Sequence, residues 1–104
     1  MLSKKHELLD SVKARLGPNY IANTDNVIVD ILNDVEKEAY DFSHLKTKKE
    51  RLHPYIKEAT ISEYNQRGYE GMLSRNEGGI SSSFRDILEK MRKDIVRARL
   101  RRLD

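Results

Sequence analysis

The chain has 104 residues, of which 38% are hydrophobic and 36% are charged, and its formal net charge is +3 at pH 7. This length and balance predict one domain over residues 1–104, with a single modest core. The absence of cysteine excludes disulfides, thiolate metal sites and cysteine nucleophiles. Because the sequence holds neither a signal peptide nor an apolar run of about 18 residues, we expect a soluble intracellular protein with no membrane partner.

The first predicted helix covers residues 3–16. Ser3 can cap its free N–H groups, and Gly17 and Pro18 end it, because glycine allows a left-handed cap and proline cannot extend the hydrogen-bond ladder. The residues expected on its buried face recur at helical spacing and are Leu8, Leu9, Val12 and Leu16.

A second helix is predicted after Thr24, which is placed to act as its N-cap, and Asp25 suits the positive end of the helix dipole. The run from Val27 to Val29 alone is typical of a strand. Apolar residues nevertheless continue beyond it at spacings of three and four, which indicates a helix. The expected buried residues are Val27, Ile28, Ile31, Leu32, Val35 and Ala39.

The start of the third helix carries two competing signals. Residues 47–50 match a capping box, whereas Pro54 would break a helix that began there. A short turn over residues 47–53, followed by a helix from Pro54 to Gly68, reconciles both signals. The expected buried residues of this helix are Tyr55, Ile56, Ala59, Ile61 and Tyr64.

Residues 68–83 are predicted to form a flexible loop, because glycines make the backbone permissive and serines contribute little to a core. A loop of this length is either a plain linker or a segment that becomes ordered on contact with neighbouring subunits. The last helix then begins with Ser83 as its N-cap and has Asp86 in its first turn. Its expected buried residues are Phe84, Ile87, Leu88, Met91 and Ile95.

These elements predict an all-α fold, a small antiparallel bundle of about four helices with a long Gly/Ser loop before the last helix. Residues 97–104 form a basic C-terminal arm that is expected to extend beyond the core. Three interpretations of this arm stay open: a solvated helix end, a docking arm for another protein, and a contact to nucleic-acid phosphates. Asn and Gln are absent among its arginines, so sequence-specific reading of DNA is not expected.

The sequence carries no pattern of residues that supports catalysis or cofactor binding. The histidines, His6, His44 and His53, do not pair at helical spacing, so no metal site is expected. Gly78 and Gly79 are not followed by the Lys-Ser/Thr of a phosphate-binding loop, and the nearby serines lack a base. We therefore expect no enzyme activity, no metal and no cofactor.

Two neighbouring phrases resemble the head–tail connector (adaptor, or head completion) proteins of long-tailed bacteriophages. They are residues 59–71, ATISEYNQRGYEG, and residues 74–84, SRNEGGISSSF. In that family a helix ends in an Arg-Gly-x-Glu-Gly phrase, a Ser-x-x-Glu-Gly-Gly-x-Ser loop follows, and an aromatic residue opens the last helix. The resemblance covers residues 59–88, whereas the first fifty residues share only helix order and size.

The resemblance implies a structural role in the virion neck, with assembly in the host cytoplasm. Such connectors form an oligomeric ring, usually of about twelve copies, that docks under the portal protein. The ring extends the channel through which DNA passes without sequence-specific binding, and it offers the attachment surface for the next neck or tail-completion protein. It implies that the assembly loop includes Gly68, Tyr69, Glu70, Gly71, Glu77, Gly78 and Gly79, and that the portal-docking arm includes Arg97, Arg99, Arg101 and Arg102.

A thin core and a glycine-rich loop fit a subunit that is monomeric in isolation and completes its burial in an oligomer. Two other hypotheses remain beside the connector. One is a small basic helical module that binds nucleic acid or regulates, and the other is a general helical interaction domain.

Overall fold

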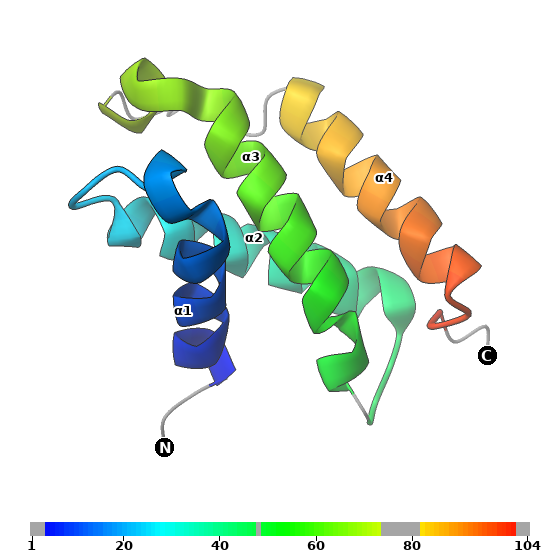
Figure 1. Ribbon diagram of the computed structural model, residues 1–104. Coiled ribbons are helices and arrows are strands. Elements are labelled where there is room, and N and C mark those ends of the chain that lie inside the picture. Colours follow the sequence, from blue (N-terminus) through cyan, green and yellow to red (C-terminus); the bar gives the residue numbers. More distant parts are fainter. Residues whose placement is uncertain (1–3, 48, 74–81, 102–104) are drawn as a thin grey trace.

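The computed structural model describes residues 4–47, 49–73 and 82–101 (Figure 1). Four α-helices and two short 3-10 helices make up this part of the chain, and no strand occurs in it. In chain order they are α1 (Lys4–Leu16), η1 (Gly17–Asn19), α2 (Asp25–Ser43), η2 (Lys49–Leu52), α3 (His53–Leu73) and α4 (Ser82–Arg97). The predicted all-α fold class is therefore confirmed. The predicted cap Ser3 lies outside the described residues.

Helix α3 occupies the centre of the molecule and packs against each of the other three helices. In Figure 1, α1 and α4 lie on either side of α3, and α2 crosses behind α1 and α3 toward the C-terminal end of α4. Helices α3 and α4 run antiparallel, as expected of helices that follow each other in a small bundle (Figure 1). The fold therefore has two layers, with α2 forming the second.

One hydrophobic core fills the space between the layers. Helices α1, α2 and α4 each contribute residues at spacings of three, four or seven, so each buries one face as the sequence predicts. The fully or nearly fully buried apolar residues are Leu8, Val12, Leu16, Ile28, Ile31, Leu32, Val35, Ala39, Leu52, Ile56, Ala59, Tyr64, Phe84, Leu88, Met91 and Ile95. The predicted core residues Leu9, Val27, Tyr55, Ile61 and Ile87 are only partly buried and pack at its margin.

Helices α1, α2 and α4 are each followed by a left-handed residue, and among these three residues only Gly17 is a glycine. Gly17 follows α1 with φ of 52°, the conformation that the sequence predicts for it. His44 follows α2 with φ of 57°, and its N–H donates to the carbonyl of Tyr40 at 3.2 Å, which closes that helix end.

The beginning of α3 follows the predicted compromise between two signals. A 3-10 turn over Lys49–Leu52 precedes the helix, which begins at His53 with Pro54 as its second residue. Proline is tolerated there because the N–H groups of the first turn have no partner within the helix.

The predicted end of α3 at Gly68 is wrong, because the helix continues through this residue to Leu73. A glycine inside a helix costs only about 1 kcal/mol relative to alanine, and the residues that follow include good helix formers. Helix α4 begins at Ser82, one residue before the predicted cap Ser83. The predicted loop over residues 68–83 is therefore shorter, and residues 74–81 lie outside the described part of the chain.

No helix in the described residues is long and apolar enough to cross a membrane.

Candidate docking surface at the end of helix α4

The C-terminal end of α4 is closed by a Schellman cap built on an arginine. Arg99 adopts φ of 58°, and its N–H donates to the carbonyl of Val96 at 3.0 Å. The N–H of Leu100 reaches back to the carbonyl of Ile95, also at 3.0 Å. These two bonds define the motif, and the partly buried Leu100 packs against the core, a contact that often accompanies it. The chain therefore turns back onto the bundle after α4.

This turn places Arg101 on the ring of Phe42, near the end of α2. The guanidinium carbon lies 4.4 Å from the ring centroid, and Nε donates to the Phe42 carbonyl at 3.3 Å. The cation–π contact and the hydrogen bond together hold this exposed arginine against α2. The prediction that the arm extends beyond the core is therefore wrong for Leu100, which packs against the core, and for Arg101, which lies on Phe42 of α2.

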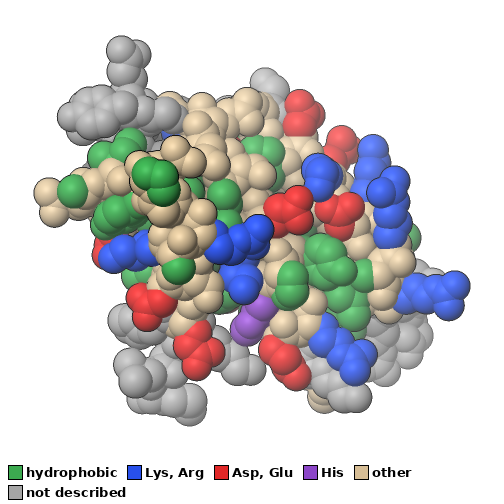
Figure 2. All heavy atoms as spheres, viewed as in Figure 1, with side chains coloured by type: hydrophobic (Ala, Val, Ile, Leu, Met, Phe, Trp, Pro, Cys, Tyr) green, Lys and Arg blue, Asp and Glu red, His purple; other side chains and the backbone are tan. Residues whose placement is uncertain are grey.

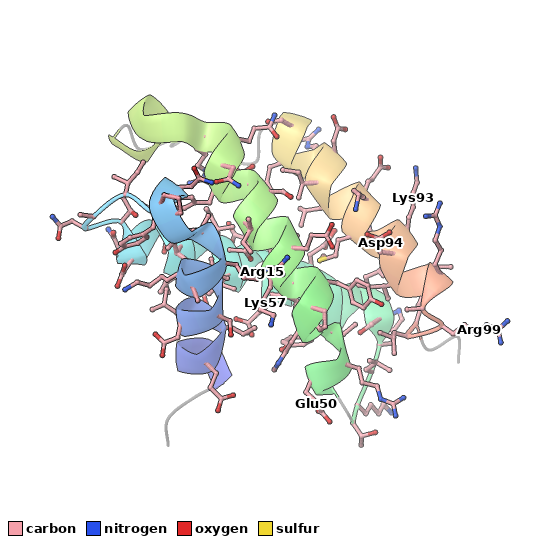
Figure 3. The ribbon with its side chains drawn as sticks, in the orientation of Figure 1. Arg15, Glu50, Lys57, Lys93, Asp94 and Arg99 are labelled. Atoms are coloured by element: carbon pink, nitrogen blue, oxygen red, sulfur yellow. The ribbon has the colours of Figure 1, made fainter. Side chains whose placement is uncertain are left out.

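The four predicted arm residues have different surroundings. Arg97 and Arg99 are exposed, and Figure 3 shows Arg99 projecting away from the helix end. The guanidinium of Arg101 lies on the ring of Phe42, and Arg102 lies outside the described residues. The structure thus brings three of the arginines to one end of α4 and leaves two of them directed to solvent.

An open groove runs along this end of the molecule, between α4 and the last turn of α2. Its volume is about 380 Å³, and it is lined by Phe42, Glu89, Arg92, Lys93, Val96 and Arg97. Val96 is 50% exposed and is the one large hydrophobic side chain of the described residues that is so exposed. Three cations and a single carboxylate therefore surround an apolar floor.

One ion pair joins the two helices at the edge of this groove. The Arg92 guanidinium contacts the carboxylate of Glu38, and both side chains are about one-third exposed, at 34% and 29%. This pair adds a polar contact between the C-terminal half of α2 and α4, whose apolar faces share the core. Lys93 and Arg97 form no ion pair within the described part of the chain, so their charge is available to a partner.

A second and smaller hollow lies between α3 and α4. Apolar side chains reach the surface there beside charged groups of both signs (Figure 2). Lys90 Nζ spans the hollow and donates to Glu58 at 3.3 Å and to Asp94 at 3.1 Å. The carboxylate of Asp94, followed by that of Glu58, raises the pKa of Lys90. Because its charges are paired internally, this hollow is a weaker docking candidate than the groove.

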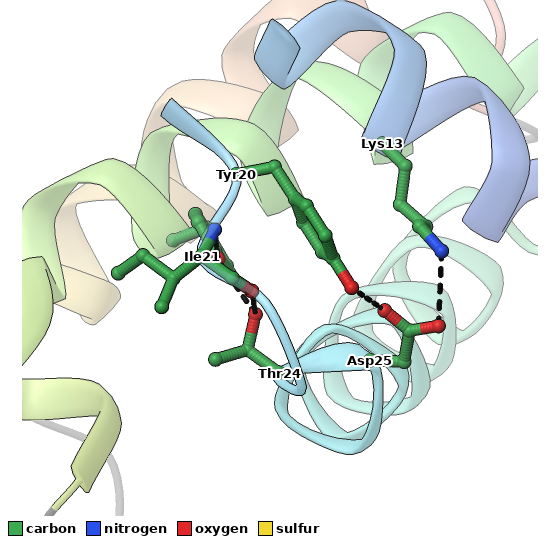
Figure 4. Close-up of polar contacts among 6 residues, drawn as sticks. Lys13, Tyr20, Ile21, Thr24 and Asp25 are labelled. Atoms are coloured by element: carbon green, nitrogen blue, oxygen red, sulfur yellow. Dashed lines mark hydrogen bonds and ion pairs between the residues drawn. The ribbon is translucent and has the colours of Figure 1, made fainter. Parts of the chain in front are cut away.

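The opposite end of the molecule holds a compact polar cluster at the turn between α1 and α2 (Figure 4). Asp25 accepts hydrogen bonds from the hydroxyl of Tyr20 and from Lys13 Nζ, the latter at 3.0 Å. These two bonds, that from Tyr20 first, lower the pKa of the Asp25 carboxyl below its usual value of 3.8. All three groups are satisfied by one another, so the cluster holds the turn and offers no open ligand position.

The predicted cap residue Thr24 precedes α2, but its hydroxyl makes no capping bond to that helix. It donates instead to the carbonyl of Ile21 at 2.6 Å, and the Ile21 N–H donates to the Tyr64 hydroxyl at 2.8 Å. Because a threonine hydroxyl has one hydrogen, Tyr64 must donate to Thr24, at 2.7 Å. The buried hydroxyl of Tyr64, from α3, thus provides hydrogen-bond partners for two groups of this turn.

The predicted assembly-loop residues fall into two groups. The C-terminal part of α3 contains Gly68, Tyr69, Glu70 and Gly71. Glu77, Gly78 and Gly79 lie outside the described residues. Within the described part of the chain, no group of acidic residues, histidines or cysteines is arranged to hold a metal ion.

The comparisons with known proteins decide the family. A family model described as "Phage gp6-like head-tail connector protein" matches residues 6–99. The chain belongs to this connector family. No curated protein and no solved structure matches it.

The family match extends well beyond the two phrases that carry the resemblance in the sequence. The matched residues include nearly all of α1 and the whole of α2, α3 and α4. The family match therefore covers the entire helical fold. The family name describes a structural part of a phage, the junction of head and tail. The connector is thus a component of the phage neck.

Two residues of the groove were not predicted from the connector's sequence. Phe42 follows the periodic core positions of α2 and looks like one more of them, whereas the structure leaves it half-buried beneath Arg101. Val96 stands out only after the buried face of α4 is known, because it then falls outside that face. The signal available in the sequence was an apolar residue flanked by Ile95 and Arg97.

Proposed function

We propose that the connector is a ring subunit of the phage neck that docks under the portal protein. In this proposal the ring, of about twelve copies, extends the channel through which DNA leaves the head and presents a surface to the next neck or tail protein. The single observation that supports it is the family match over residues 6–99. The surface chemistry of α4 is consistent with it.

The C-terminal arm is the part that we propose to engage the portal. Arg97 and Arg99 are exposed in the free subunit and can form charge-assisted hydrogen bonds with carboxylates of a partner. Arg101 and Arg102 would join them. For Arg101 this requires release from Phe42, whose contacts are exposed and therefore weak.

The assembly loop is the part that we propose to join neighbouring subunits. It comprises Gly68, Tyr69, Glu70 and Gly71 at the end of α3, followed by Glu77, Gly78 and Gly79. Subunits that each provide this segment to the next copy form a heterologous contact, and such contacts close into a ring when the rotation allows.

Electron microscopy of the purified connector mixed with the portal protein of the same phage tests this function. The expected result is a second ring stacked under the portal, formed only when both proteins are present. Portal particles without added density at saturating connector concentration would contradict the proposal. An Arg99→Glu/Arg101→Glu variant should leave the portal unoccupied, whereas an Arg15→Glu variant on α1 should bind as the wild type does.

Binding to duplex DNA is the second candidate function, because Lys93, Arg97 and Arg99 are exposed and unpaired within the described residues. Helix α4 contains neither Asn nor Gln, so any such binding would rest on phosphate contacts. A salt titration separates the two functions. Steep loss of tight DNA binding with rising salt supports a nucleic-acid module, and weak binding at all salt concentrations supports the neck role.

A further inference from the structure

The groove at the end of α4 has an exposed apolar floor and an excess of positive charge at its rim. Its floor is Phe42 and the half-exposed Val96, and its rim holds Lys93 and Arg97, which have no carboxylate partner in the described part of the chain. An occupant that fits must bring carboxylates at helical spacing and an apolar side chain.

One side of α2, at the margin of the core, has this chemistry. Val27, Asp30, Asp34 and Asp41 follow one another at spacings of three, four and seven residues, which places them on one face of the helix. The three aspartates are exposed and form no ion pair among the described residues, and Val27 is only partly buried. We call these four residues the acidic stripe.

The geometry points to a second copy of this chain as the occupant of the groove: the acidic stripe of one copy packs on the groove of the next. In that contact Asp30 and Asp34 pair with Lys93 and Arg97, and Val27 covers Val96. The pair Arg92–Glu38 within one copy already joins a carboxylate of α2 to a cation of α4. The contact between copies repeats this chemistry at the groove's unpaired cations.

The inference rests on the ring proposed above and names the surfaces that build it. Because stripe and groove are different surfaces, each copy can offer its stripe to one neighbour and its groove to another. The charges are exposed, so the contact is weak between free subunits and is strengthened when a portal gathers many copies.

Paramagnetic relaxation in solution can detect so weak a contact, and the portal is not needed. The chain has no cysteine, so one introduced cysteine carries a spin label at a single position. Copies labelled at Asn33→Cys, on the outer side of α2, are mixed with isotope-labelled wild-type copies. The expected result is broadening of the amide signals of Lys93, Val96 and Arg97. The same label at Arg15→Cys on α1 is the matched control and should leave these signals sharp (Figure 3).

Charge reversal gives the decisive comparison. Lys93→Glu/Arg97→Glu and Asp30→Lys/Asp34→Lys should each weaken self-association by about ten-fold or more, because each places like charges opposite each other. Mixing the two variants should restore it, since the acidic groove of the first then meets the basic stripe of the second. All four residues are exposed and unpaired in the described structure, so both variants should fold; only Arg97→Glu, which places a negative charge at the C-terminal end of α4, should lower the melting temperature slightly.

Three results would overturn the inference. The first is that the amide signals of α4 in the wild-type copies stay sharp beside copies labelled at Asn33→Cys, at low salt and high protein concentration. The second is self-association that survives both charge reversals. The third is sedimentation in which association of the wild type stops at two copies. None of these measurements includes the portal. If the groove does not bind the stripe, stacking of the connector under the portal is still measured separately. If stacking fails, the contact between copies can still be observed.

Discussion

The hydroxyl groups of Tyr64 and Thr24 lie 2.7 Å apart and close a cycle of hydrogen bonds around Ile21. Tyr64 comes from the middle of α3 and Thr24 from the turn before α2, and both are buried, at 2% and 6% exposure. Through this cycle both backbone groups of Ile21 are satisfied by side chains. The cycle joins the turn between α1 and α2 to the centre of the fold.

Replacing Tyr64 by phenylalanine keeps the ring and removes the hydroxyl. The Ile21 N–H then loses its acceptor in a site with little water, so we expect the free energy of unfolding to fall by about 1–3 kcal/mol. Urea denaturation followed by circular dichroism measures this loss. Tyr55→Phe is the matched control, because Tyr55 is partly exposed and makes no hydrogen bond in the described structure; it should change stability by less than about 0.5 kcal/mol. Equal effects for the two variants would contradict the cycle.

The pKa of Asp25 makes the stability of the fold depend on acid. Its carboxyl is held below 3.8 in the folded chain by Tyr20 and then by Lys13, so the charged form contributes stability above that pH. This contribution disappears as the pH falls through the folded-state pKa. We expect the melting temperature of wild type to exceed that of Asp25→Asn at pH 7, and the difference to shrink below about pH 4. A difference that stays constant down to pH 2 would be inconsistent with the ionised pair.

Tyr40 provides the corresponding test in alkali. Burial of its hydroxyl and the nearby charge of Glu36 raise the pKa of Tyr40 from 10.0 to about 12. Because the folded state favours the neutral phenol, the stability that this group contributes is present below pH 10 and is lost as the pH rises through 12. An ultraviolet absorbance titration should show late tyrosine ionisation whose amplitude Tyr40→Phe reduces by one tyrosine; the hydrogen bond to Asp25 also raises the pKa of Tyr20, so the comparison is made in a Tyr20→Phe background. If the late step persists in that variant, it belongs to another tyrosine.

Arg99 occupies a backbone conformation that costs a side-chain-bearing residue about 1–2 kcal/mol. We expect Arg99→Gly to raise the free energy of unfolding by about 0.5–1 kcal/mol relative to Arg99→Ala. The alanine variant is the proper reference, because both changes remove the same positive charge from the helix end. Thermal denaturation of the two variants checks the order, and an equal or lower stability for glycine would show that φ at this residue is not positive.

The sequence predicted most of the fold because local signals and burial agree in it. The apolar spacing of α1, α2 and α4 is simple, and Pro54 marks the start of α3 within one residue. Gly68 misled the prediction, since a glycine that ends one helix is indistinguishable in sequence from one that a helix tolerates. Tertiary contacts decide that question.

The candidate surface was predicted less completely than the fold. The basic character of the chain end was evident, but nothing in the sequence states that Arg101 folds back onto Phe42, a residue 59 positions away. Likewise, Thr24 was expected to serve its own helix, whereas its hydroxyl bonds to Tyr64 and Ile21. Both differences are contacts between distant parts of the chain, which residue spacing does not encode.

The central position of α3 also bears on how a newly made chain acquires its shape. Helices α1 and α2 leave the ribosome before α3, yet the Ile21 N–H in their connecting turn obtains its acceptor only from Tyr64. The N-terminal pair is therefore incomplete until the third helix has been synthesised, and α4, made last, packs on both α2 and α3. Folding of this chain is consequently expected to finish as a single cooperative event after translation rather than helix by helix.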